Sequence, residues 1–183
     1  DGATFTDNKV SNSYVSAEGK ANTSAFGGSI TANTGTFLNV RNTAFLRSKA
    51  DTVLMSGGAV SLHAGAVGTL ENVTVSGCSV KGTGGAIYSS MSTLVLKGST
   101  VSECYGVAGG AIHLSGDAVA EVYESSFDKN TSPDGGCFGN DGKGSMLYVN
   151  ECLFTGNKAT NYGGVFRGAT HGKTGAFFNN CRF

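Results

Sequence analysis

Apolar and polar residues alternate over short stretches of this chain, and the stretches return at a nearly constant interval. Each stretch holds two mostly apolar positions separated by one residue. The earlier position is Leu38, Gly68, Leu94, Ala120, Leu147 and Ala176, and the later one is Val40, Leu70, Leu96, Val122, Val149 and Phe178. A more polar residue follows the later position, as in Arg41, Glu71 and Lys97. Alternation with a period of two predicts β-strands, and no sustained 3.6-residue period supports a helical solenoid.

A Gly-Gly pair introduces a second apolar position in every copy. The first glycines of the pairs are Gly27, Gly57, Gly84, Gly109, Gly135 and Gly163, and three residues later stand Ile30, Val60, Ile87, Ile112, Phe138 and Phe166. The pairs are 30, 27, 25, 26 and 28 residues apart, and 17 to 20 residues after each first glycine stand Phe45, Val75, Val101, Phe127, Phe154 and Phe183. An interval this steady marks an internal repeat.

A unit of about 27 residues with two or three short strands cannot bury its apolar face alone. Stacking equivalent units pairs strand with strand in parallel and places like residues on like. The sequence therefore predicts an all-β protein, a single-stranded parallel β-helix of about six rungs of 25–30 residues. We expect one domain over 1–183, with rungs starting near 27, 57, 84, 109, 135 and 163 and an excursion loop over 10–26. The inward ladder is expected to run from Ile30 to Phe166 in chain order.

The glycines and asparagines of the repeat have backbone reasons for their positions. We expect Gly85 and Gly110 to hold a geometry that other residues resist, because glycine adopts positive φ at little cost. An asparagine stands three residues after several of the Phe positions, as in Asn130 and Asn157, and stacked amides can bond along the axis. Small residues replace it elsewhere, as in Ser48 and Cys78.

Charge and composition narrow the class of protein. The chain has 13 basic and 13 acidic residues in 183, so its formal net charge is zero, and 29 residues are glycine. A chain with zero net charge lacks the excess of basic residues that binds nucleic acid or an anionic membrane surface. No apolar run approaches the ~18 residues of a membrane span, and no signal peptide is visible.

These residues resemble a known repeat. The pairing of Gly-Gly-Ala-Ile, as in Gly84 to Ile87 and Gly109 to Ile112, with Phe-x-x-Asn, as in Phe5 with Asn8, Phe127 with Asn130 and Phe154 with Asn157, is similar to the repeat of the chlamydial polymorphic outer membrane proteins. Other rungs depart from it, with Val75 and Cys78, Val101 and Cys104, and Phe45 and Ser48. The resemblance implies an autotransporter passenger at the cell surface, without catalysis. Together with the rung length, it indicates a right-handed helix.

Five cysteines and three histidines are the first candidates for chemistry. Cys78 with Cys104, and Cys152 with Cys181, share repeat positions and should stack on adjacent rungs, either as buried thiols or as strained disulfides. Cys137 has no partner. No Cys-x-x-Cys or histidine cluster suggests a metal site. His113 is expected on an outward face as a solvated ladder residue, and no cofactor is expected.

Several charged residues also share repeat positions. Arg41, Glu71 and Lys97 should alternate in sign along one outward column. Glu124 and Glu151 share a turn position, where they either splay into water or hold a cation such as Ca²⁺ between them. Sequons place possible glycosylation at Asn22, Asn72 and Asn130, although modification of Asn130 would conflict with its burial in the ladder.

Three functions fit such a chain. The first is a non-enzymatic extracellular or cell-surface module for adhesion or display, whose partner is a host or cell-surface receptor. The second is a building block of an extracellular filament or coat. The third is a polysaccharide-degrading β-helix enzyme, which needs clustered carboxylates on one outward groove. The acidic residues here, among them Asp117, Asp128, Asp134 and Asp141, fall at different repeat positions, so the enzyme is the weakest of the three.

Both ends of the sequence resemble incomplete rungs of the repeat. Phe5 to Asn8 repeats the ladder motif near the start, and Phe183 is again the ladder residue. An uncovered end of a β-helix exposes unpaired backbone groups, which solenoids usually cap. We therefore expect the chain to be a section of a longer rod, stacked on adjacent repeats or on copies of itself.

Overall fold

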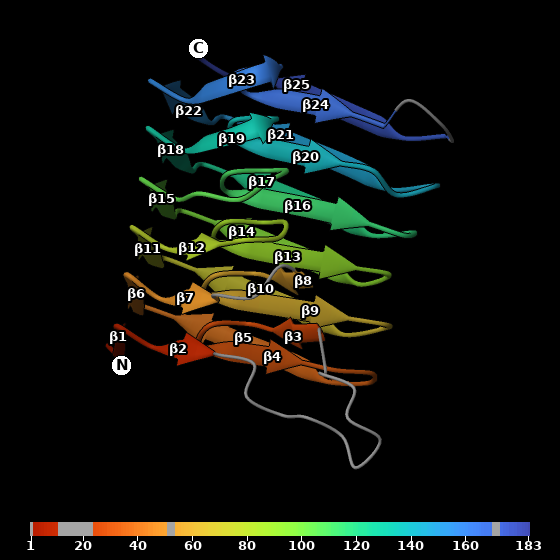
Figure 1. Cartoon of the computed structure of the whole chain (residues 1–183). Coiled ribbons are helices and arrows are strands. Elements are labelled where there is room, and N and C mark those ends of the chain that lie inside the picture. The colour runs from red at the N-terminus through yellow and green to blue at the C-terminus, as the bar shows by residue number, and fades with distance from the viewer. Residues whose placement is uncertain (1, 11–23, 51–53, 170–172) are drawn as a thin grey trace.

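The structure is a computed structural model, and it describes residues 2–10, 24–50, 54–169 and 173–183. Its described part consists of strands and turns and contains no helix. Parallel strands from successive rungs stack into three six-stranded sheets that enclose one apolar core, giving the predicted right-handed parallel β-helix (Figure 1). Each rung contributes one strand to each sheet.

We name the three sheets by their sequence landmarks. The Gly-Gly sheet contains β4 (Ile30–Ala32), β9 (Val60–His63), β13 (Ile87–Ser90), β16 (Ile112–Ser115), β20 (Phe138–Asn140) and β24 (Phe166–Gly168). The long sheet contains β5 (Phe37–Arg41), β10 (Val67–Glu71), β14 (Thr93–Lys97), β17 (Val119–Tyr123), β21 (Met146–Asn150) and β25 (Gly175–Asn179). The Phe sheet contains β1 (Thr4–Thr6), β6 (Ala44–Leu46), β11 (Thr74–Ser76), β15 (Thr100–Ser102), β18 (Ser126–Asp128) and β22 (Leu153–Thr155).

Shorter strands follow the Phe sheet in several rungs. They pair as β2 (Lys9–Val10), β7 (Lys49–Ala50) and β12 (Ser79–Val80), as β19 (Thr131–Asp134) with β23 (Lys158–Tyr162), and as β3 (Ser24–Phe26) with β8 (Leu54–Ser56). The predicted excursion over 10–26 is therefore too long at both ends, because Val10 belongs to β2 and residues 24–26 form the paired strand β3. The rest of that range, 11–23, lies outside the described residues.

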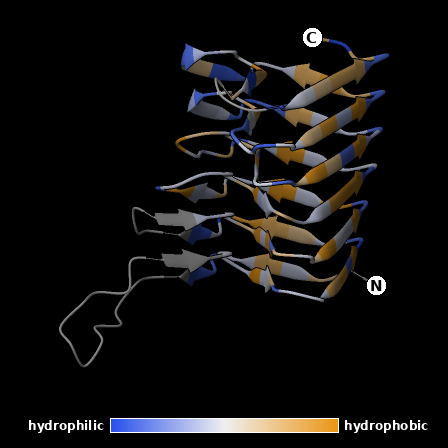
Figure 2. Cartoon of the chain, turned by 90° about the vertical axis from the view of Figure 1, so that its right-hand side faces the viewer, coloured by the Kyte–Doolittle hydropathy of each residue, from blue (hydrophilic) through white to orange (hydrophobic). Residues whose placement is uncertain are grey.

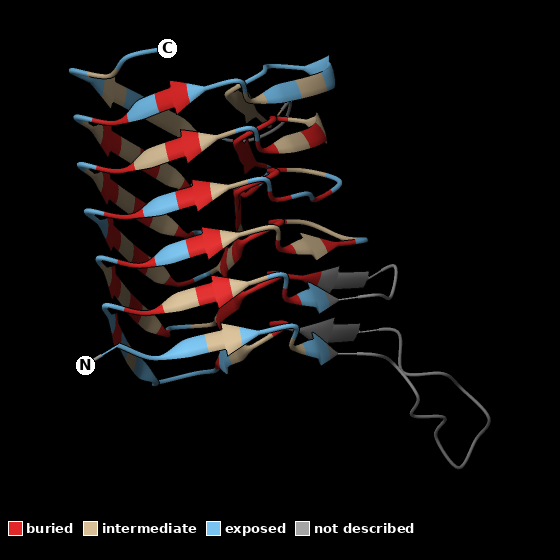
Figure 3. Cartoon of the chain, turned by 90° about the vertical axis from the view of Figure 1, so that its left-hand side faces the viewer, coloured by how far each residue is buried: buried red, intermediate tan, exposed pale blue. Residues whose placement is uncertain are grey.

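The strand register stacks equivalent residues as the repeat predicts. In the Gly-Gly sheet Ile30 pairs with Val60, and the ladder continues through Ile87, Ile112, Phe138 and Phe166. In the Phe sheet the ladder runs through Phe5, Phe45, Val75, Val101, Phe127 and Phe154. Figure 3 shows the resulting alternation in the Phe sheet, where β6, β11, β15, β18 and β22 each have a buried residue between two more exposed ones.

Apolar side chains concentrate along the strands, whereas the turns between sheets are hydrophilic (Figure 2). Stacked phenylalanines add ring contacts to this burial. The rings of Phe5 and Phe45 lie 5.0 Å apart, and those of Phe127 and Phe154 lie 5.3 Å apart and nearly parallel. Each such pair contributes about 0.5–1.5 kcal/mol beyond its buried area.

The Gly-Gly pair is required for two different reasons. The first glycine adopts a left-handed backbone, with φ of 69° at Gly84 and 66° at Gly109. The second glycine does not, so positive φ is not the reason that Gly85 and Gly110 resist substitution. Those two positions exclude a side chain for lack of space, because a Cβ on Gly85 would overlap the carbonyl oxygen of Gly110 and one on Gly110 would overlap that of Gly136.

An amide ladder closes the corner after the Phe sheet. The Asn157 side-chain oxygen accepts from the backbone and side-chain nitrogens of Asn130, and the Asn130 oxygen accepts from the backbone nitrogen of Cys104. The Asn130 amide also donates to Val101 O at 2.9 Å. Because Asn130 is fully buried, the candidate glycosylation site at Asn130 is wrong for the folded chain.

We predict that Ile112→Asp destabilises the fold by more than about 3 kcal/mol, because it buries a charge between Ile87 and Phe138. Urea denaturation measures the loss. Asn39→Asp, at an exposed position on the long sheet, is the matched control and should change stability little. Equal midpoints for Ile112→Asp and the parent would mean that this register is wrong.

We predict that Gly110→Ala costs more than about 2 kcal/mol, because the new methyl group forces the neighbouring rung to move. Gly98→Ala is the control: Gly98 has φ of 57° but open space around it, so only backbone strain of about 1 kcal/mol should appear. The same denaturation curves compare the two. A smaller loss for Gly110→Ala than for Gly98→Ala would contradict the packing argument.

Candidate functional site on the outer face of the Gly-Gly sheet

A row of rings and charged groups crosses the outer face of the Gly-Gly sheet. Tyr88 of β13 and His113 of β16 are register partners and stack along the helix axis. His63 of β9 is in register with Ser90, and its ring contacts Tyr88 diagonally. The ring centroids of His63 and Tyr88 lie 5.5 Å apart, and those of Tyr88 and His113 lie 5.9 Å apart with an interplanar angle of 4°. Asp141, just after β20, continues the row, and its Oδ1 lies 3.1 Å from Nε2 of His113.

The alternation of the strands explains why these side chains point outward. Ile112 and Leu114 of β16 are buried among the apolar residues of the core, so the intervening His113 faces the other way. Tyr88 occupies the equivalent position of β13, and Gly139 that of β20. The missing side chain at Gly139 makes room for the imidazole, because a Cβ there would lie 2.7 Å from Nδ1 of His113.

His113 is nevertheless buried, with only 1% of its surface exposed. The prediction of a solvated ladder residue is therefore wrong. The chain before the Gly109–Gly110 pair doubles back beside this sheet (Figure 1). The space above Gly139 is consequently bounded both by the imidazole of His113 and by the backbone of Ala108 and Gly109. Glycine-rich repeats imply tight turns, but nothing in the sequence shows onto which face a turn folds.

Asp141 is held as an anion by its surroundings. Burial works to raise the pKa of Asp141, but the hydrogen bond and charge of His113, the hydroxyl of Ser115 and the charge of Arg167 together hold that pKa below its ordinary value. The carboxylate is still 47% exposed. The Asp141 carboxylate is thus a fixed, partly exposed anion near the charge of Arg167, and it can bind hydroxyl or cationic groups of a ligand.

The other end of the row is neutral. Nε2 of His63 lies 2.7 Å from the hydroxyl of Ser61, which is itself buried. Burial lowers the pKa of His63, so its imidazole stays uncharged at neutral pH. The row thus changes from a neutral ring at His63 to a carboxylate at Asp141 that contacts His113.

The geometry fits recognition better than proton transfer. Nδ1 of His113 is buried and has no hydrogen-bond partner among the described residues, so it lies out of reach of a substrate. Asp141 is the only carboxylate that the row contains. General acid–base hydrolysis of a glycoside uses two carboxyl groups facing one bond. Within the described part of the chain no group of three or more histidine, cysteine or acidic residues could hold a metal ion.

The cysteines are free thiols, and four of the five are buried. Cys78 and Cys104 occupy equivalent positions in the core, where burial raises the pKa of the Cys104 thiol well above its ordinary value. Burial likewise raises the pKa of Cys152 to about 11. Cys181 stands at the matching position of the next rung, because Arg182 donates to the carbonyl of Cys152. Thiols with raised pKa values are poor nucleophiles, so Cys104 and Cys152 act as core packing.

The predicted turn sites lie apart from the row. Glu124 and Glu151 occupy the same left-handed turn position, both exposed, and Oε1 of Glu124 lies 4.0 Å from Nζ of Lys97. Arg41 and Glu71 form the expected surface pair at 3.2 Å. Asn72 is an exposed turn residue whose amide donates to Asn42, whereas Asn22 lies outside the described residues.

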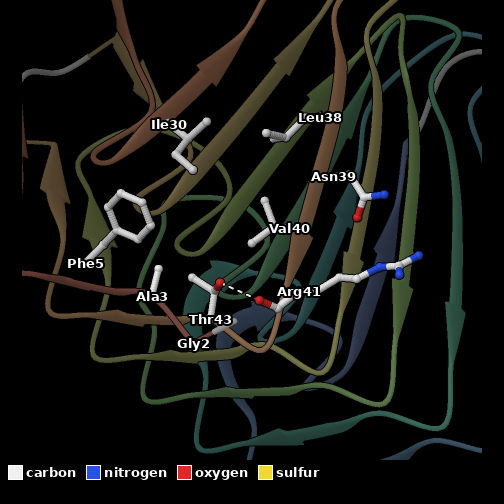
Figure 4. A pocket seen from close by; sticks show the side chains of 9 residues that line it. All are labelled: Gly2, Ala3, Phe5, Ile30, Leu38, Asn39, Val40, Arg41 and Thr43. Atoms are coloured by element: carbon white, nitrogen blue, oxygen red, sulfur yellow. Dashed lines mark hydrogen bonds between the residues drawn. The ribbon is translucent and has the colours of Figure 1, made fainter.

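A second surface feature lies at the first rung. Phe5, Ile30, Leu38 and Val40 point into the space between the three sheets and line a depression of about 330 Å³ (Figure 4). They are the ladder residues of their sheets, and here they are only partly covered, except for Val40. Arg41 and Asn39 point away from this space (Figure 4).

No protein-family profile, curated protein or solved structure matches this chain. The described residues include no apolar helix that could cross a bilayer.

We predict that Asp141→Asn destabilises the fold at pH 7 and that the difference from the parent disappears in acid. Because folding lowers the pKa of Asp141, its contribution is complete above about pH 4 and is lost as the pH falls further, through the folded pKa. Urea denaturation of both proteins from pH 7 to pH 2 measures this. Asp117→Asn, at an exposed turn, is the control. A constant difference at all pH values would contradict the ion pair.

Proposed function

We propose that this chain is a non-enzymatic module of an extracellular or cell-surface protein, and that it serves adhesion or display. The observation that carries the proposal is the outer row of the Gly-Gly sheet. It presents Tyr88, Asp141 and Arg167 on three of four successive rungs of the solenoid, while His113, on the rung between Tyr88 and Asp141, is enclosed. The resemblance of the repeat to the chlamydial polymorphic outer membrane proteins supports the same role.

The enzyme alternative lacks a reactive arrangement among the described residues. The acidic side chains with a basic side chain within 4 Å are paired singly: Asp7 with Arg47, Glu71 with Arg41, Glu124 with Lys97, Asp128 with Lys129, and Asp141 with His113. Each of these carboxylates already contacts a basic side chain, so none is a free general base. This favours binding over turnover.

A filament or coat is the second candidate, and the depression at the first rung favours it. Apolar ladder residues such as Phe5 and Ile30 would be covered by another rung, either of the same polypeptide or of a neighbouring copy (Figure 4). Sedimentation velocity separates the candidates. A filament unit should grow with concentration, and Leu38→Asp should stop this growth, whereas a display module should sediment independently of concentration.

We predict that beads coated with the chain attach to animal cells or extracellular matrix, and that Asp141→Asn combined with Arg167→Gln reduces attachment several-fold. The two changes remove the exposed charges of the row. Glu71→Gln combined with Lys97→Gln alters two charges on the long sheet and is the control, which should attach normally. Attachment no better than that of albumin-coated beads, or release of sugar from an acidic polysaccharide, would refute the proposal.

A further inference from the structure

The outer face of the long sheet changes in character toward its last rungs. In each strand of this sheet the middle residue points outward, because the residues on either side of it point toward the core. These middle residues form one column in register, which contains Asn39, Thr69, Val95, Glu121, Tyr148 and Phe177. The column begins with small side chains and ends with two aromatic rings.

The two rings belong to an apolar strip on the surface. The rings of Tyr148 and Phe177 stack with centroids 5.3 Å apart and an interplanar angle of 9°. Phe177 is 54% exposed, and Tyr148 is half-buried. A Cβ on Gly175 would lie 2.8 Å from Cε of Met146 and 3.1 Å from the Phe177 ring, so both side chains approach the space that Gly175 leaves open. Met146, Tyr148 and Phe177 therefore make up this strip.

Polar groups border the strip on two sides. Glu121 lies in register with Tyr148 on the preceding rung, and its Oε2 accepts a hydrogen bond of 2.8 Å from the hydroxyl of Tyr123. A carboxylate accepts several hydrogen bonds, so Glu121 can also accept from a ligand. Asn150 and Asn179 follow the two rings along their strands, and the Asn179 amide donates to Oδ1 of Asn150 at 3.3 Å.

The charge of this region limits the kind of ligand. Strands β17, β21 and β25 contain one charged residue, Glu121, and neither lysine nor arginine. The three preceding strands of the sheet instead carry Arg41, Glu71 and Lys97. An anionic ligand on the strip would meet the carboxylate of Glu121 with no cation on these strands to compensate it. An uncharged ligand with many hydroxyl groups meets no such repulsion.

We propose that the strip and its polar border bind a neutral polysaccharide. The faces of a sugar ring present C–H groups, which pack against the side chains of Tyr148 and Phe177. The hydroxyl groups at the edge of the ring can donate to Glu121 and can bond to the Asn150 amide in either direction. The inference goes beyond the proposed adhesive row, because the two sites lie on different sheets.

Other occupants fit the strip less well. Three apolar side chains are few for a stable contact with a second copy, since such an interface buries about 800 Å² on each partner. An anionic membrane surface attracts basic residues, whereas the charged residue here is acidic. A cationic peptide could contact Glu121 and the rings, and the experiment below separates it from a polysaccharide.

The test is native affinity electrophoresis of the intact chain in gels that contain laminarin, galactomannan, xyloglucan or pullulan, all of which are neutral. At least one should retard the chain. Phe177→Ala should raise the apparent Kd about tenfold and Glu121→Gln several-fold, whereas Phe177→Tyr, which keeps the ring, should bind like the parent. Phe37→Ala removes an 85% exposed phenylalanine from the same sheet and is the matched control, which should change the Kd less than twofold.

Migration that none of the four polysaccharides retards would overturn the inference, as would equal weakening by Phe37→Ala and Phe177→Ala. Tighter binding to polylysine than to every polysaccharide would assign the strip to a cationic partner instead. Growth in sedimentation coefficient with concentration that Phe177→Ala abolishes would assign it to a second copy. Attachment of coated beads to cells without any polysaccharide binding would refute this inference and leave the proposed adhesive role standing.

Discussion

Parallel pairing in register is the constraint on which this molecule depends. Each rung contributes one strand to each sheet, so a residue at one repeat position meets its equivalent above and below. This stacking buries the apolar residues, because each one packs on an apolar residue of the next rung, and the core continues without a gap from Phe45 to Phe154. Differences in length between rungs lie in the turns, outside the paired strands. The Gly-Gly pairs can therefore be 25 to 30 residues apart while the ladders stay aligned.

The same constraint explains which parts could be predicted from sequence. A ladder residue must fit its neighbours on both sides, so its chemistry repeats, and the six strands that begin at Ile30 to Phe166 could be placed to the residue. Asn130 and Asn157 could be placed at one corner because each amide bonds to the rung before it, Asn157 to that of Asn130 and Asn130 to that of Cys104. Repetition makes these positions visible, since each rung is an independent observation of the same environment.

The outer row could not be predicted, because it depends on how a turn folds over a sheet. The repeat positions of Tyr88, His113 and Asp141 hold other residue types in the other rungs, so no recurrence marks these side chains. Whether an outward residue is solvated depends on the fold-back of the preceding segment, here the backbone of Ala108 and Gly109. The reason for the second glycine of each pair could not be predicted from the sequence either, for a related cause. Its requirement is contact with the next rung rather than its own φ, and contacts between rungs appear only when the rungs are stacked.

Charged residues respond to stacking in the opposite way from apolar ones, and this makes them informative. A column of like charges gathers repulsion at every step, so charges in a solenoid tend to alternate or to find partners across the turn. Arg41 and Glu71 do the first, and Lys97 with Glu124 does the second. In a fold whose core is largely determined by repetition, the columns that break the stacking rule are therefore where specific function should be sought.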